Sequence, residues 1–148
     1  MPNAHDIILS RNQIDSIVAH AVSGLPNEVC GILAGRGNRV FDVIPIKNAD
    51  PSPVGYFMDT SQQIRAIRMM RKKGLNQVGI YHSHTESDAL PSAKDVELAF
   101  HPGPAYVILS LAGLHPELKA FEINKGLVKE RFIVIDRNLK ATEGVDDV

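Results

Sequence analysis

An almost continuous apolar run at residues 105–111, AYVILSL, constrains the fold more than any other segment. A strand of this length without polar alternation is typical of the centre of a sheet that is covered on both faces. The chain must therefore supply helices for two faces, and residues 10–23 and 60–73 both have the apolar spacing of an amphipathic helix. Ser10, with Gln13 three residues later, predicts the start of the first helix.

Several shorter segments complete the predicted order of elements. Turn residues such as Gly37-Asn38 separate apolar stretches that read as strands, and the segment from Ser92 reads as a third helix. The order alternates helices and strands in a way that predicts an α/β fold, a mixed β-sheet flanked by helices. The predicted strands are residues 29–34, 39–46, 78–83, 105–111, 118–123 and 128–135, and the third helix is residues 92–100.

The length of 148 residues suits a single domain covering residues 1–148, in which the small and acidic last eight residues, 141–148, are expected to fray. The 16 basic and 17 acidic side chains give no reason to expect nucleic-acid binding. No apolar run is long enough to span a membrane, and the single cysteine, Cys30, excludes an intrachain disulfide. These features indicate a cytoplasmic protein.

The segment YHSHTESDALPSAKD, at residues 81–95, contains the main candidates for metal binding and catalysis. Alternation along a strand places His82 and His84 on one face, and the same alternation places Val78 and Ile80 there as well. Two imidazoles are a common half of a zinc site, although an isolated His-x-His is also found as two polar residues at a strand end.

Ser92 and Asp95 lie at the predicted start of the third helix, where they have two possible explanations. Ser-x-x-Asp resembles a capping box, and an acidic residue in the first turn suits the helix dipole. Asp95 could also complete a catalytic type of zinc site, which keeps three protein ligands and one open position. The two explanations do not exclude each other.

These residues together resemble the JAMM (JAB/MPN) zinc metalloprotease family, in its compact prokaryotic form. The family signature is an early glutamate, then His-x-His, seven residues, Ser, two residues and Asp. The segment from His82 to Asp95 matches that spacing in full, and PNEVCGILAG at residues 26–35 resembles the early block, which puts the glutamate at Glu28. Thr85 departs from the proline that the family often has after the second histidine.

The resemblance implies a role for each matching residue. His82, His84 and Asp95 would hold one Zn²⁺ per chain, Glu28 would be the general acid and base, and Ser92 would hydrogen-bond the oxyanion. It also implies a JAB/MPN domain similar to the cytidine-deaminase fold. The implied activity is metallopeptidase or isopeptidase cleavage after the C-terminal Gly-Gly of a ubiquitin-like or sulfur carrier protein, whose tail would be the substrate partner.

Two alternatives stay open from the sequence. One is a non-catalytic scaffold of the MPN class, whose members usually lack the metal ligands. The other is a zinc hydrolase that acts on a non-peptide amide. Lys94, between Ser92 and Asp95, is a further candidate for facing the substrate.

Overall fold

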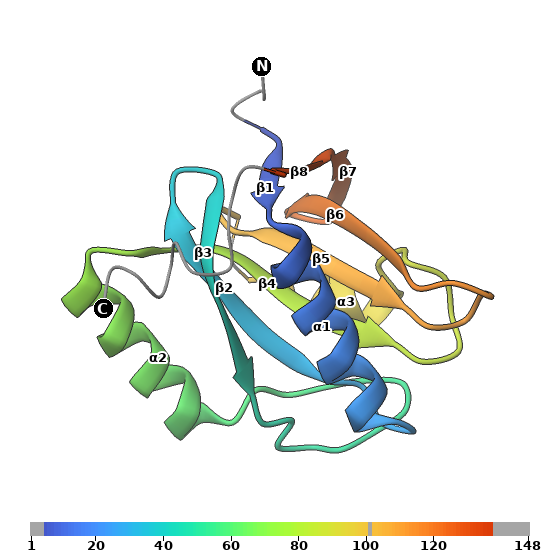
Figure 1. The fold of residues 1–148 in the computed structure, drawn as a ribbon. Coiled ribbons are helices and arrows are strands. Elements are labelled where there is room, and N and C mark those ends of the chain that lie inside the picture. Colours follow the sequence, from blue (N-terminus) through green and yellow to red (C-terminus); the bar gives the residue numbers. More distant parts are fainter. Residues whose placement is uncertain (1–4, 101, 138–148) are drawn as a thin grey trace.

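A mixed β-sheet forms the centre of the molecule (Figure 1). The computed structural model describes residues 5–100 and 102–137. Within these residues, eight strands form one sheet in the order β7-β6-β5-β4-β2-β3-β1-β8. The strands are β1 (Ile7–Leu9), β2 (Cys30–Arg36), β3 (Arg39–Ile46), β4 (Asn76–His84), β5 (Ala105–Ser110), β6 (Glu117–Asn124), β7 (Leu127–Arg131) and β8 (Ile133–Ile135). The predicted α/β class and the mixed sheet are confirmed.

The parallel pair β4 and β5 lies inside the sheet, as the apolar run predicted. Every residue of β5 is buried, and the register pairs His84 with Ser110 at the carboxyl ends of the two strands. On the other side, β4 runs antiparallel to β2, with His82 opposite Cys30. The carboxyl end of β4 is therefore flanked by the end of β5 and by the beginning of β2.

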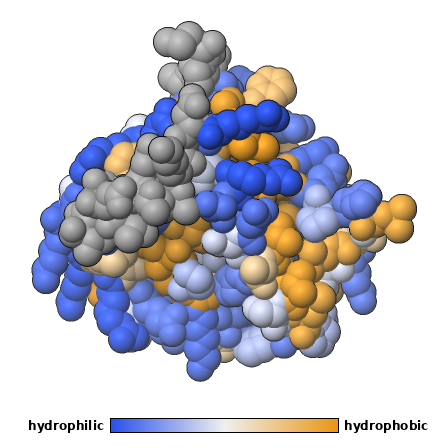
Figure 2. All heavy atoms as spheres, in the orientation of Figure 1, coloured by the Kyte–Doolittle hydropathy of each residue, from blue (hydrophilic) through white to orange (hydrophobic). Residues whose placement is uncertain are grey.

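Two helices cover opposite faces of the sheet. Helix α1 (Arg11–Gly24) begins at the predicted Ser10–Gln13 capping box and buries Ile17 and Ala21 in the cluster that contains Leu33, Tyr81 and Val107. Helix α2 (Thr60–Lys73) buries Ala66 and Met70 in the opposite cluster, which contains Ile32, Ile80 and Ile108. Figure 2 shows hydrophilic side chains over the outward side of α2. None of the helices in the described residues is long and apolar enough to cross a membrane.

Helix α3 (Ala93–Glu97) is shorter than the predicted helix of residues 92–100. After Glu97 the backbone tightens, because Ala99 donates to the carbonyl of Val96 and Phe100 donates to that of Leu98. Leu98 and Phe100 leave the helical path and line a pocket instead.

The two edges of the sheet differ from the prediction. Strand β1 was not predicted because three apolar residues are too few to give a pattern, and its pairing with β3 and β8 is non-local. The predicted strand of residues 128–135 is two strands, β7 and β8, which break at Phe132 and lie at opposite ends of the strand order. Because one residue separates them, the sheet must curl until its edges meet (Figure 1). Residues 141–148, expected to fray, lie outside the described residues.

The prediction that Val78 shares a face with Ile80 is wrong. The β2–β4 register shifts between Leu33 and Ala34, so that Gly79 pairs with Leu33 and Gln77 with Ala34. Val78 is the extra residue of this bulge and packs in the cluster on the α1 face, whereas Ile80 packs on the α2 face. A bulge interrupts the alternation of side chains along a strand. Beyond it the alternation resumes, so Ile80 and His82 share a face.

The close approach of Gly31 to Tyr81 gives a prediction for stability. A Cβ atom at Gly31 would lie 2.2 Å from Tyr81 Cε2, and the Tyr81 side chain is fully buried. We expect Gly31→Ala to lower the free energy of unfolding by about 2 kcal/mol through overpacking. Gly103→Ala is the control, because nothing lies within 4 Å of its Cβ position. Denaturant unfolding of both variants tests this, and equal stabilities would contradict it.

Candidate metal centre

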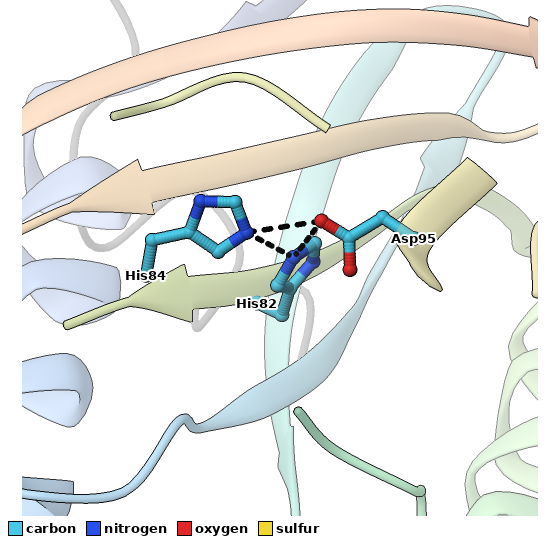
Figure 3. Close-up of side chains that lie close together, drawn as sticks. All are labelled: His82, His84 and Asp95. Atoms are coloured by element: carbon cyan, nitrogen blue, oxygen red, sulfur yellow. Dashed lines mark hydrogen bonds and ion pairs between the residues drawn. The ribbon is translucent and has the colours of Figure 1, made fainter. Parts of the chain in front are cut away.

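Three side chains converge at the carboxyl end of β4 (Figure 3). His82 and His84 come from the strand, and Asp95 comes from the first turn of α3. His82 Nε2 and His84 Nε2 are 3.2 Å apart, and Asp95 Oδ2 lies 3.2 Å from the first and 3.0 Å from the second. The two imidazoles are buried, with exposed fractions of 1% and 3%.

The spacing of these three atoms fits a tetrahedral metal ion. Ligands of such an ion lie about 3.4 Å apart when each is about 2.1 Å from zinc, which is close to all three separations. Two nitrogens and one carboxylate oxygen are also ligand types that zinc accepts, and the count of three is that of catalytic sites.

The hydrogen bond of His84 Nδ1 supports the same conclusion. This nitrogen lies 2.7 Å from the carbonyl oxygen of Asp88, so it must carry a proton and donate it. In the neutral imidazole, Nε2 then presents a lone pair to Asp95 Oδ2. Only a proton or a metal cation between the two atoms makes that contact favourable. A backbone carbonyl that fixes the tautomer of a histidine is a frequent outer partner in metal sites.

The electrostatics of the cluster favour a negative Asp95 beside a positive charge. Burial by itself would raise the pKa of Asp95, but hydrogen bonds from His82 and His84 hold that pKa well below its usual range. Burial lowers the pKa of His84, yet its bonds to Asp95 and to the Asp88 carbonyl outweigh burial and raise it.

Glu28 reaches this cluster from β2. Ser83 N donates to the carbonyl of Val29, so the β2–β4 pairing continues beyond Cys30. Cys30 pairs with His82 in the antiparallel β2–β4 register. Two residues further along, on the same face, this register places Glu28 beside His84. The Glu28 side chain is buried, its Oε1 atom has no hydrogen-bond partner among the described residues, and burial raises its pKa to about 7. A carboxylate held near the cluster with such a pKa can exchange protons near neutral pH.

Ser92 forms the capping box that the sequence predicted. Its Oγ accepts from Asp95 N at 3.0 Å, and its own backbone N donates to Asp95 Oδ2 at 2.9 Å, which completes a capping box. The same carboxylate oxygen faces both histidines. The cap therefore orients Asp95 toward them, and the exposed Ser92 hydroxyl keeps its proton for another acceptor.

Two contacts at the site lie beyond what the sequence indicated. The ring of Tyr56 stacks on His82 at a centroid distance of 4.7 Å. Asn48 Nδ2 donates to the carbonyls of Glu28 and Gly55, at 3.0 and 3.3 Å, and so joins the loop that carries Tyr56 to the segment that carries Glu28. The sequence indicated only that residues 48–54 form a loop. A loop composition does not reveal which side chains and carbonyls will be in contact.

The other candidates have ordinary surroundings. Cys30 is buried and its thiol donates to the carbonyl of Ile46, as expected for a core residue. Thr85, the departure from the family pattern, donates from its hydroxyl to the carbonyl of Pro53 and ties two loops at the site. Glu86 is exposed, and Asp88 acts through its backbone carbonyl.

A pocket of about 310 Å³ opens beside the cluster. His82 and Asp95 line one end of it, and Lys94 lies beside them. Its remaining lining is mainly apolar and comes from the sheet, the loop before α2 and the end of α3: Gly55, Tyr56, Phe57, Met58, Gln63, Ile80, Leu98, Phe100, Tyr106, Ile108 and Ile123.

Comparison with known proteins gives consistent relatives. Residues 10–124 match the family of prokaryotic homologues of the JAB domain. The CysO-cysteine peptidase of Mycobacterium tuberculosis is 38% identical over 127 residues, which cover 84% of this chain and 87% of that protein. The desampylase of Haloferax volcanii is 39% identical over 112 residues, covering 71% and 81% of the two chains.

A solved structure agrees with these relatives. The solution structure of a Desulfitobacterium hafniense protein is 42% identical, with a TM-score of 0.82, and covers 90% of this chain and 95% of its own. The resemblance inferred from the His-x-His motif is thereby confirmed. The chain belongs to the family of prokaryotic homologues of the JAB domain, the compact prokaryotic JAMM type.

Proposed function

We propose that the protein is a zinc-dependent peptidase that hydrolyses the bond after the Gly-Gly tail of a ubiquitin-like or sulfur carrier protein. The observation that supports this most directly is the convergence of His82, His84 and Asp95 within 3.2 Å, with Glu28 buried beside them. A scaffold needs no such arrangement, and the peptidases among the relatives favour a peptide over another amide.

His82, His84 and Asp95 would hold the zinc ion. When bound, zinc lowers the pKa of a water molecule and polarises the scissile carbonyl. Glu28 would take a proton from the attacking water as the water oxygen adds to the carbonyl carbon. Ser92 donates its hydroxyl proton in a hydrogen bond to the carbonyl oxygen as that oxygen gains negative charge. Glu28 then delivers the proton to the departing amine, so that the C–N bond breaks and a carboxylate and an amine remain.

The proposed substrate follows from the shape of the site and from the relatives. The cluster is buried at a strand end, so an extended tail reaches it more easily than a folded surface does. A Gly-Gly tail has no side chains to obstruct entry, and its backbone can pair with a strand edge. One relative is named for a peptidase of CysO-cysteine, and another is a desampylase.

Glu28→Gln tests the proton-transfer role. The amide keeps the shape of the side chain but cannot take a proton, so we expect zinc to stay bound while kcat falls by roughly 10²-fold or more. Glu97→Gln, an exposed change on α3, is the control and should keep normal turnover. Zinc content and kcat are measured together. Loss of zinc in Glu28→Gln would make Glu28 a ligand and contradict the assignment.

Ser92→Ala separates capping from catalysis. Loss of the cap should cost about 1 kcal/mol of stability. Loss of the hydroxyl donor should lower kcat by about 10²-fold. Ser10→Ala is a matched control, because Ser10 forms the same capping box on α1. It should lower the melting temperature without lowering turnover of the folded enzyme. If Ser92→Ala behaves like Ser10→Ala in both measurements, only the capping role remains.

The substrate proposal is tested with two proteins. We expect the zinc-loaded enzyme to cleave a ubiquitin-like sulfur carrier extended beyond its terminal Gly-Gly, and to cleave ubiquitin chains slowly or not at all. Mass spectrometry of the products gives the site of cleavage. Efficient cleavage of ubiquitin chains with the extended carrier left intact would overturn the substrate assignment but would leave the zinc chemistry in place.

A further inference from the structure

The two histidines of the candidate metal centre are oriented in different ways. His84 Nδ1 donates to the carbonyl of Asp88 at 2.7 Å, and this bond fixes its ring. His82 Nδ1 is buried and has no hydrogen-bond partner in residues 5–100 and 102–137. A histidine that binds a metal almost always has such a partner on its second ring nitrogen. The orientation of the His82 ring must therefore be fixed by a different contact.

The ring of Tyr56 makes that contact. It stacks on the His82 ring at a centroid distance of 4.7 Å and an interplanar angle of 29°. Aromatic rings in such an arrangement attract each other beyond the gain from burial. Figure 3 shows His82 Nε2 directed toward Asp95. A tilt of the His82 ring about its Cβ–Cγ bond would turn Nε2 away from Asp95, and it would also break the stack.

The side chain of Asn48 binds the residues on either side of Tyr56. Its Nδ2 donates to the carbonyl of Gly55 at 3.3 Å, and its Oδ1 accepts from Phe57 N at 3.0 Å. The backbone adds a further bond across the same loop, because Ala49 N donates to the carbonyl of Phe57 at 2.7 Å. The backbone position of Tyr56 therefore depends on Asn48.

The same loop binds both backbone polar groups of Glu28. Asn48 Nδ2 donates to the Glu28 carbonyl at 3.0 Å, and Glu28 N donates to the carbonyl of Ser52 at 2.8 Å. One side chain thus connects the segment that carries the proposed general base to the tyrosine that contacts a proposed metal ligand.

Two further contacts attach this loop to the segments of the other ligands. Thr85, the residue after the second histidine, donates from its hydroxyl to the carbonyl of Pro53 at 3.0 Å. Lys94, the residue before the aspartate, lies across Gly55, where an added Cβ atom would be 2.5 Å from the lysine Nζ. The loop is therefore held from several sides, and Tyr56 has a fixed position from which to orient the His82 ring.

Resting on the proposed function, we propose that Tyr56 and Asn48 are positioning residues of the metal centre. The Tyr56 ring keeps His82 Nε2 directed at the metal position. Asn48 keeps Tyr56 and Glu28 at a fixed separation, so that the metal ligand and the general base retain their relative places. Both residues act through His82 and Glu28 and not on the substrate.

Zinc affinity tests the role of Tyr56 without turnover. The full-length variants are titrated with zinc in competition with a chromophoric chelator. We expect Tyr56→Ala to weaken zinc binding by about tenfold, and Tyr56→Phe, which keeps the ring, to retain the parent affinity. Phe41→Ala is the matched control, because Phe41 is also partly buried against the α2-face cluster and should affect only stability. Parent affinity in Tyr56→Ala, or an equal loss in Tyr56→Phe or Phe41→Ala, would overturn the proposal.

The visible spectrum of the cobalt-substituted protein tests the geometry directly. Co²⁺ takes the place of Zn²⁺, and its ligand-field bands depend on how the ligands are arranged around the ion. At saturating cobalt, we expect changed bands in Tyr56→Ala and parent-like bands in Tyr56→Phe and Phe41→Ala. A parent-like spectrum of Tyr56→Ala would contradict the positioning role.

A double-mutant cycle tests whether Asn48 acts through Tyr56. Asn48→Ala should weaken zinc binding as Tyr56→Ala does, and the double variant should be no weaker than the weaker single variant. Gln62→Ala is the control, because Gln62 Oε1 accepts a similar bond from Lys47 N, at 2.7 Å, outside this loop. Additive losses in the double variant, or a loss in Gln62→Ala as large as that in Asn48→Ala, would overturn the role of Asn48.

Turnover separates this proposal from the proposed function. With zinc saturating, Asn48→Ala should still lower kcat by about tenfold, because Glu28 is also displaced, whereas Tyr56→Ala should recover more of its activity. Equal kcat in the parent and Asn48→Ala would contradict the link to Glu28. A parent protein that binds zinc but cleaves no extended carrier would contradict the peptidase function alone, since the zinc and cobalt measurements do not depend on cleavage.

Discussion

The contacts of one carboxylate oxygen, Asp95 Oδ2, determine how the site is built. It faces His82 Nε2 and His84 Nε2 at 3.2 and 3.0 Å and accepts from Ser92 N at 2.9 Å. The proton on His84 Nδ1 leaves a lone pair on Nε2 of the neutral ring, so its contact with this negative oxygen is unfavourable unless a proton or a metal cation lies between the two atoms. Three segments must therefore be held in one arrangement: the end of β4, the short polar loop after it and the first turn of α3. The capping box at Ser92 stabilises that arrangement from the helix side, and the Asp88 carbonyl stabilises it from the loop side.

The sheet supplies the remaining parts through its register. The antiparallel pairing of β2 with β4 carries Glu28 to His84, and the parallel pairing of β4 with β5 brings Ser110 beside the same strand end. Ser110 Oγ donates to the carbonyl of Ser87 and so fixes the loop whose next carbonyl binds His84. The loop before α2 closes over the other side, where Tyr56 stacks on His82. Segments distant in the sequence thus form one site because each is attached to a central strand.

The sequence predicted those features that depend on short-range patterns. The helices at Ser10 and Thr60 have clear periodicity and caps, and the spacing from His82 to Asp95 identified the family. The bulge at Val78 and the short strand β1 could not be predicted, because both depend on pairing with distant strands. The same reason hid Asn48, whose role arises from side-chain bonds to two backbone carbonyls, one of them 20 residues away. The residue types alone did not show whether Ser92 caps α3 or belongs to the site. In the structure, the capping box of Ser92 also orients Asp95 toward the two histidines.

We infer that His82, His84 and Asp95 together hold one metal ion. Elemental analysis of the purified protein, after equilibration with limiting zinc and removal of free metal, tests this most directly. We expect about one zinc per chain in the parent protein and in His115→Ala, an exposed control. We expect almost none in His82→Ala or His84→Ala, provided that circular dichroism shows both variants to be folded. Undiminished zinc in the two folded variants would show that these histidines are not the ligands.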